Sequence, residues 1–362
     1  MALQNLSILQ ILRGEFIANS DGSKFGTIVN NEFVPYDIFF TPNVPTVNPM
    51  LSVPLTLEAM ENNVTVTFVS SASGPVTYKI NGGTAQIIES EAVEYITLDN
   101  VGDRVEFYGN NTTYATTTSD FSNITCNKDC YVYGNIMSLI NSENYESTTT
   151  LTGTYTFCSL FRDNTYIKNK DGADLLLPAT TLTKSCYNSM FYGCTSLTTA
   201  PALPATTLAD YCYESMFNGC ISLTAAPELP ATILTRYCYV HMFENCTDLT
   251  SAPVLPATTL AYGCYASMFM YCTNLTISPV LHAATLTDRC YESMFGGCTN
   301  LNEVTCLATD ISASTCIEYW LSDVASTGTF TKAANMSKWT TFISGGSGTG
   351  IPSGWTVQDY IA

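Results

Sequence analysis

The 362-residue chain carries little charge, and very little of that charge is basic. Charged residues make up 12% of the sequence, and 13 basic side chains stand against 31 acidic ones, giving a net charge of -18. Phosphate backbones repel a chain this acidic, so we expect no nucleic-acid partner. We interpret the excess of acidic residues as a net charge that keeps an apolar chain soluble. The alternative interpretation is that the chain mimics an acidic ligand.

The sequence lacks three further features, each of which is typical of a class of protein. The sequence has no apolar run of about 18 residues, so we expect no membrane span. The segment Met1–Gln10 lacks a basic leader followed by an apolar core, which indicates no secretory signal. No glycine-rich phosphate loop is present either.

Histidine is almost missing. Only His241 and His282 occur, and a nucleophilic mechanism needs a base and an orienting group that two isolated histidines do not supply. The acids Asp163, Asp210 and Glu214 are predicted on surface turns. A carboxylate pair for glycoside cleavage stays open, but the sequence singles out none. We therefore predict no catalytic residue, no cofactor and no metal.

What the chain does contain is a repeat. A Met-Phe pair recurs every 26 residues, with a Cys-Tyr pair four residues before the Met and a second cysteine four residues after it. A leucine follows, and Leu-Pro-Ala-Thr-Thr-Leu or a variant closes the unit. Five copies without a change of register establish a repeat architecture. The pairs are Met190-Phe191, Met216-Phe217, Met242-Phe243, Met268-Phe269 and Met294-Phe295.

The spacing within one unit predicts how it folds. Cys212, Met216 and Cys220 are four residues apart, which favours a short helical segment near 209–219 that turns them inward. The stretch 223–227 ends in proline and suits a brief strand. One unit cannot bury its own apolar side, whereas stacked units can. We predict a mixed α/β, leucine-rich-repeat-type solenoid over residues 121–325, with the Met-Phe pairs and the thiols as its structural core.

The 15 cysteines point to the same core. Ten of them occupy two fixed phases of the repeat, whereas zinc sites usually need closer pairs joined to a second pair or to histidines. Cys126 and Cys130 have a zinc-like separation, but no second pair stands near them. Because free cysteine is among the most buried residue types, we interpret the two phases as columns of core thiols. Disulfides stay open if the chain meets an oxidising space.

The flanking regions differ from the repeat. Val64–Val69 and Val76–Ile80 alternate in polarity, and Asn81-Gly82-Gly83 marks a hairpin, so residues 51–120 are predicted to form a small, Ig-like all-β sandwich. Residues 1–50 are predicted to be an extended arm and linker that attaches the chain to something else. Residues 326–362 are predicted to cap the solenoid.

Differences between the copies indicate a binding face. Packing fixes the core slots, so the varied slots are predicted to face solvent in a row that a partner would bind. Neutral drift on a surface that binds nothing explains the variation equally well. The predicted binding positions are Tyr192, Asn218, Glu244 and Met270 after the Met-Phe pairs, Thr199, Ala225, Ser251 and Ile277 in the predicted strand, and Glu228 beyond it.

The unit Cys-Tyr-x-Ser-Met-Phe-x-Gly-Cys-Thr-Ser-Leu-Thr-x-Ala-Pro-x-Leu-Pro-Ala-Thr-Thr-Leu, best seen at 186–208, resembles the BspA-like leucine-rich repeats. The likeness spans residues 123–325, although the unit here is a few residues longer than is usual in that family. The segments 133–139 and 351–355 also resemble pieces that flank such repeats in proteins of gut bacteria and their phages. The resemblance implies a surface adhesin or binding protein.

Bacterial members of that family normally enter a secretion route, and the missing leader therefore favours a virion. We expect a non-enzymatic surface protein of a tailed bacteriophage, either capsid-decorating, head-fibre or tail-associated. Residues 1–50 would attach it to other virion proteins, and the solenoid would face a host surface glycan or protein. A bacterial cell-surface adhesin is the alternative, and self-association into a homo-oligomer is left open.

Overall fold

The computed structural model describes residues 17–18, 25–29, 32–35, 48–342 and 350–361. The chain divides into two compact units, Met1–Asn48 and Pro49–Ala362. In the first unit, β1 (Ile17–Ala18), β2 (Phe25–Val29) and β3 (Glu32–Pro35) form an antiparallel sheet in that order. Apart from these strands and residues 48–50, the predicted arm lies outside the described residues.

The second unit begins with two sheets packed face to face. Their strands are β4 (Leu55–Ala59), β5 (Val64–Val69), β6 (Val76–Ile80), β7 (Gln86–Ile88), β8 (Val93–Leu98), β9 (Arg104–Gly109), β10 (Asn123–Cys126), β11 (Cys130–Asn135) and β12 (Ile167–Lys168). One sheet has the order β10-β5-β8 and the other β12-β11-β4-β9-β6-β7. Alternate residues of β5 are buried, and its Phe68 packs on Phe107 of β9 with ring centroids 5.4 Å apart. The strands β10 and β11, which follow residue 120, thus complete the sandwich.

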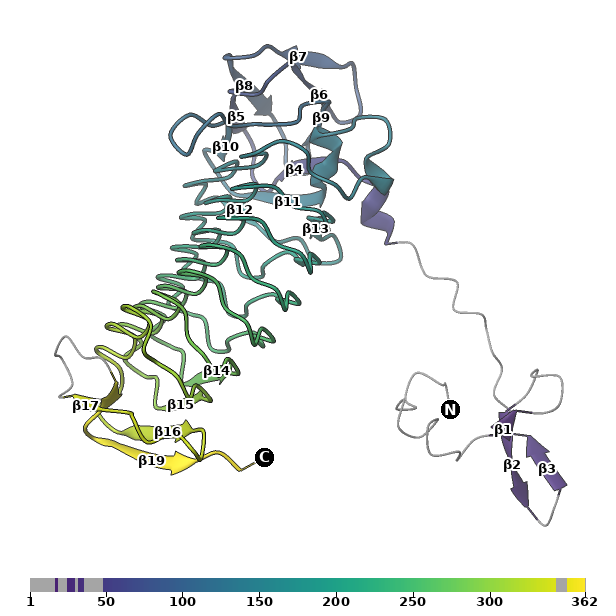
Figure 1. Ribbon diagram of the computed structural model, residues 1–362. Helices are drawn as coiled ribbons and strands as arrows, with labels where there is room; N and C mark the ends of the chain where they lie inside the picture. The colour runs from purple at the N-terminus through teal and green to yellow at the C-terminus, as the bar shows by residue number, and fades with distance from the viewer. Residues whose placement is uncertain (1–16, 19–24, 30–31, 36–47, 343–349, 362) are drawn as a thin grey trace. The chain divides into compact units, whose positions relative to one another are not determined.

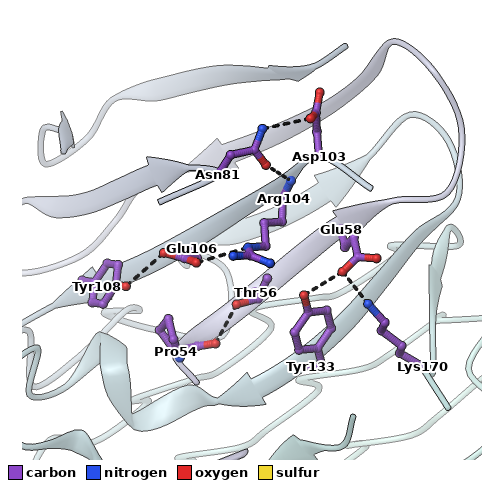
Figure 2. A network of polar contacts seen from close by, with 10 residues as sticks. All are labelled: Pro54, Thr56, Glu58, Asn81, Asp103, Arg104, Glu106, Tyr108, Tyr133 and Lys170. Carbon is purple, nitrogen blue, oxygen red and sulfur yellow. Dashed lines mark hydrogen bonds and ion pairs between the residues drawn. The ribbon is translucent and has the colours of Figure 1, made fainter. Parts of the chain in front are cut away.

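One of these sheets continues into the repeats. Strand β11 pairs antiparallel with β4 on one side and parallel with β12 and β13 (Leu175–Leu176) on the other. Lys170, which lies between β12 and β13, forms an ion pair with Glu58 of β4, and the Tyr133 hydroxyl donates to the same carboxylate at 2.7 Å (Figure 2). The sandwich and the repeats share one continuous apolar core from Leu55 to Trp355.

The repeats form a stack of coils (Figure 1), and each coil contains a ribbon of consecutive turns. Within a ribbon, every second N–H donates three residues back along its own coil, as Met190 does to Tyr187 at 3.2 Å. The intervening N–H groups donate to carbonyls of the next coil at 2.7–3.1 Å. In one ribbon these donors and acceptors are Ser185 and Asp210, Tyr187 and Cys212, Ser189 and Glu214, Phe191 and Met216, and Gly193 and Asn218.

The turn ribbon replaces the expected helix near 209–219, because no α-helix occurs among the described residues. The part of the chain that the structure describes has three short 3-10 helices instead, none of them in the regular repeats. They are η2 (Pro49–Ser52), η3 (Ile136–Leu139) and η4 (Tyr145–Ser147). The chain is therefore a β-rich protein with a 26-residue repeat, and the helical part of the predicted mixed α/β fold is not confirmed.

The turn ribbon requires a left-handed residue at every fourth position. The φ angle is +55° at Ser185, +53° at Ser189 and +71° at Gly193, and the equivalent positions of the other ribbons are also positive. A non-glycine residue held there costs about 1–2 kcal/mol. Hydrogen bonds between the coils must offset that cost at each step. The recurring serine and glycine of the repeat mark these positions in the sequence.

The ribbon turns pairs of adjacent residues inward, where each stacks on its equivalents in neighbouring coils. The rings of Tyr213 and Tyr239 lie 5.8 Å apart and those of Phe217 and Phe243 5.7 Å apart, nearly parallel in both cases. All the predicted core residues have 0% exposure. They are Met190, Phe191, Met216, Phe217, Met242, Phe243, Met268, Phe269, Met294, Phe295, Cys212 and Cys220.

The thiols take part in the same stacking. All 15 cysteines are buried and unpaired. The Cys220 thiol donates to the Phe191 carbonyl of the preceding coil at 3.1 Å, and Cys246 donates in the same way to Phe217 at 3.1 Å. Cysteine suits this slot because it is small and apolar yet supplies a weak donor.

Prolines decide where the second half of a coil becomes a regular strand. Pro227 and Pro230 lack the N–H of a ladder residue, and the strand pairing in this half of these coils consists of isolated bridges such as Thr199 to Ala225. Where His282 replaces the second proline, a parallel sheet begins with the order β14-β15-β16-β19. Its strands are β14 (Ile277–Leu281), β15 (Glu303–Cys306), β16 (Gly328–Lys332) and β19 (Trp355–Asp359).

The final residues close the aromatic column. Trp339 stacks on Trp320 at 5.5 Å between ring centroids, and the Trp320 indole N–H donates to the Gly350 carbonyl at 2.6 Å. Two short strands, β17 (Thr341–Phe342) and β18 (Ile351–Pro352), pair beside them. These contacts cover the end of the core as the predicted cap requires, although residues 343–349 of that segment lie outside the described residues.

Two neighbouring residues of one ribbon should respond to glycine in opposite ways. Ser267 has a φ of +53°, so Ser267→Gly relieves strain and should stabilise the protein by about 1 kcal/mol. Ala266 is not at positive φ, so Ala266→Gly should cost about 0.5–1 kcal/mol. Urea denaturation followed by tryptophan fluorescence measures both. Destabilisation by both substitutions would indicate a helix and contradict the turn ribbon.

Candidate functional site

Three tyrosines follow one another along the outer side of the turn ribbons. Tyr211 and Tyr237 directly precede the buried Cys-Tyr pairs of their coils, and Tyr262 lies one residue earlier in the next coil. Ring centroids are 5.2 Å apart between Tyr211 and Tyr237, and also between Tyr237 and Tyr262. We call these three residues the tyrosine ladder. Each ring is half-buried, so the ladder presents aromatic surface to solvent.

Basic residues lie at the tyrosine ladder. The basic residues within 177–325 are three in number: Lys184, Arg236 and Arg289. The Lys184 ammonium lies 5.8 Å from the ring centroid of Tyr211, and the Arg236 guanidinium lies 4.7 Å from that of Tyr262. Cations hold such positions over ring faces through the quadrupole of the aromatic ring. The basic residues of these repeats are therefore gathered on one surface of an acidic chain.

A pocket opens beside the ladder where one coil has small side chains. Ala266 and Ser267 stand where the preceding coil has the larger Val240 and His241, and the resulting pocket has a volume of about 340 Å³. Val240 and Ala266 give it an apolar part, and Tyr237 forms part of its wall. We call this pocket the notch.

The notch depends on a glycine. Gly263 has a φ of +60°, and a Cβ placed on it would lie 2.3 Å from the Tyr237 ring. Any larger residue would therefore push Tyr237 out of the ladder in addition to straining the backbone. The other coils have Ser185, Tyr211, Tyr237 and Arg289 at this position, so glycine is not what the ribbon itself demands.

An ion pair forms one rim of the notch. Arg289 Nη2 donates to Glu292 Oε1 at 3.0 Å, and Arg289 Nε also contacts Glu292 Oε2. Hydrogen bonds to Glu292 and then to Tyr262 raise the pKa of Arg289. This bidentate geometry fixes the guanidinium at the edge of the pocket.

The other rim carries a second acid and an imidazole. Glu214 Oε2 accepts from Asn188 Nδ2 at 2.5 Å. Burial raises the pKa of Glu214, and the nearby His241 and the Asn188 hydrogen bond oppose that effect in part. His241 Nδ1 lies 2.8 Å from Glu244 Oε2, but this contact lacks hydrogen-bond geometry. The rim thus offers both donors and acceptors to a ligand.

These groups are suited to binding. An apolar floor, aromatic walls and a few charged or hydroxyl groups are what small-ligand pockets combine. The notch brings an imidazole and two carboxylates near Ser267, but no hydrogen bond joins that serine hydroxyl to any of them. Among the described residues, no three His, Cys, Asp or Glu side chains are grouped to hold a metal ion.

The positions predicted after the Met-Phe pairs lie on the turn ribbons. Asn218 is buried and donates to Glu244 Oε2 at 2.8 Å, while Tyr192, Glu244 and Met270 are half-buried. The Arg162 guanidinium covers the Tyr192 ring at 4.5 Å from its centroid. These side chains contact one another and leave only part of their surface to a partner.

The positions predicted in the strand form a separate row. Thr199, Ala225, Ser251 and Ile277 are exposed, and the isolated bridges Thr199 to Ala225 and Ala225 to Ser251 join three of them. Glu228 is exposed at a second pocket, also of about 340 Å³, that prolines dominate. The two predicted sets therefore belong to different segments of the coil and do not form one row.

The notch residues were not predicted as a site, although the sequence holds a trace of them. The residue before each Cys-Tyr pair changes from Ser185 to Tyr211, Tyr237, Gly263 and Arg289 along the five copies. Comparing the copies at this slot would have placed Tyr211, Tyr237 and Gly263 in one row.

No family model, curated protein or solved structure matches the chain. Among the described residues, no helix is long and apolar enough to cross a membrane.

Proposed function

We propose that this chain is a non-enzymatic phage virion surface protein whose solenoid, of the BspA-like leucine-rich-repeat type, binds a host-surface glycan. The observation that carries the binding role is the notch beside the tyrosine ladder. The virion setting comes from the sequence resemblance, with residues 1–50 as the attachment to other virion proteins.

A glycan fits the notch better than a peptide or a hydrophobic ligand. Sugar rings have apolar C–H faces that pack on aromatic side chains, and hydroxyl edges that need donors and acceptors. The notch places Tyr237 and Ala266 beside Ser267, Glu214 and Arg289. A volume near 340 Å³ lies at the low end of the range of about 300–1,000 Å³ for small-ligand pockets.

The rigidity of the solenoid favours a role in which it presents a binding surface. Each ribbon donates five backbone hydrogen bonds to the next coil, and the aromatic columns run without a break from Tyr114 to Trp339. A ligand that binds to such a scaffold orders few additional side chains, which lowers the cost of binding. Neighbour-to-neighbour contacts also let the outward residues vary without disturbing the core.

Filling the notch should weaken glycan binding. The double variant Ala266→Val with Ser267→His copies the preceding coil, Val240 and His241, into the notch, so the ribbon should tolerate it. We expect at least about tenfold weaker binding to host cells or to a glycan array, which corresponds to about 1.4 kcal/mol. The control Ala225→Val alters an exposed residue outside the notch and should bind as the parent does. Unchanged binding by the filled variant would reject the notch as the site.

Purified particles distinguish the virion from the alternative, a bacterial cell-surface adhesin. In the virion case, mass spectrometry should detect the chain in phage purified through a density gradient, and deletion of residues 1–50 should remove it from the particles. A chain that surface proteolysis of intact bacteria releases, and that is missing from particles, would favour the adhesin.

A further inference from the structure

We propose that the notch selects an acidic sugar, whose carboxylate is bound by Arg236 and Lys184 while its ring occupies the space above Ala266. This inference rests on the proposed glycan-binding function and adds the charge of the ligand. A hexuronic acid or a sialic acid has the required chemistry.

The charges around the notch leave two cations unmatched. Among the described residues, neither Lys184 nor Arg236 forms an ion pair with a carboxylate. Both are exposed, and they lie on the same tyrosine ladder. Two cations on one ladder that form no ion pair keep hydrogen-bond donors available to an external carboxylate.

The carboxylates of the same region are already occupied. Asp210 Oδ1 accepts from the Arg236 backbone N–H at 3.1 Å, and Asp288 Oδ1 accepts from the Ser314 N–H at 2.9 Å. Glu292 is bound by Arg289. These acids keep their charge, but among the described residues none of them forms an ion pair with Arg236 or Lys184.

The fourth acid, Glu214, also has a partner already. Its carboxylate accepts from Asn188 and lies against the notch, where burial raises its pKa. Its carboxyl oxygens can accept from sugar hydroxyls.

The positions of the cations suit a sugar acid more than a free anion. The Arg236 guanidinium lies 5.3 Å from the ring centroid of Tyr237, and Tyr237 also lines the notch. A ligand that places its ring in the notch can therefore extend a carboxylate past Tyr237 to Arg236. Arginine binds a carboxylate through two parallel hydrogen bonds, which orients the ring as well as holding the charge.

The negative net charge does not prevent this selection. At physiological ionic strength the screening length is about 8 Å, so the charges around the notch determine the local potential more than distant acids do. Because both cations are exposed, salt should weaken the contribution of the ligand's carboxylate to the binding affinity.

The test compares sugars that differ only in the carboxylate charge. An oligogalacturonide, a hyaluronan tetrasaccharide and sialyllactose, each beside its methyl ester, are titrated into the full chain by calorimetry. We expect at least one acid to bind about tenfold or more tightly than its ester, and the difference to shrink severalfold when salt is raised. Arg236→Gln should abolish the difference between acid and ester.

A matched control is available on the same face. Arg162 also lies over a ring, that of Tyr192 at 4.5 Å, but it already contacts Asp163, and Tyr192, unlike Tyr237, does not line the notch. Arg162→Gln should leave all affinities as they are. Equal binding of acid and ester in every pair would overturn the selection for acid and leave glycan binding standing. Absence of binding to these sugars and to neutral glycans alike would overturn both.

Discussion

The structure depends on the hydrogen bonds that every second residue of a turn ribbon donates to the next coil. These bonds form only if a residue with positive φ recurs every four positions, as at Ser185, Ser189 and Gly193. Once that condition holds, neighbouring coils are in register, and the tyrosine, phenylalanine, methionine and thiol columns follow from it. The hydrogen bonds between coils thereby offset the backbone strain of the positive-φ residues within each coil. A single coil therefore has no independent stability.

The candidate site can form because the inward-facing and outward-facing slots of the repeat are under different constraints. Core slots must repeat because each is packed against its own equivalents, whereas the outward slots have no such constraint. Replacing a ladder position by Gly263, beside Ala266, is enough to open a pocket without moving the backbone. The cations at Lys184 and Arg236 lie on the same ribbon surface, so pocket and charge are held at a fixed distance by the scaffold. A site of this kind can change its ligand by substitutions that leave the fold intact.

The repeat period, the core slots and the strands at 64–69 and 76–80 could be predicted from the sequence, because each rests on a regular polarity pattern. The turn ribbon could not, because residues four apart such as Cys212 and Met216 also share one face of a helix. The adjacent buried pair Met216-Phe217 and a small residue at every fourth position distinguish the two, and both have to be seen across several copies. The notch could not be predicted for another reason. It forms where side chains are small or absent, and the sequence alone indicates only a turn at Gly263, because the contact with Tyr237 appears only in the folded chain.

Deleting one complete repeat tests the register of the coils most directly. Removal of residues 203–228 joins Ala202 to Leu229 and preserves the 26-residue period, whereas a deletion two residues shorter shifts every following column. Reaction of the native protein with a water-soluble thiol reagent reports whether the core is closed, since all its cysteines are buried. We predict that the full-repeat deletion keeps its thiols protected until the protein unfolds, while the shorter deletion exposes them. Equal protection in the two proteins would contradict a core held together by coil-to-coil register.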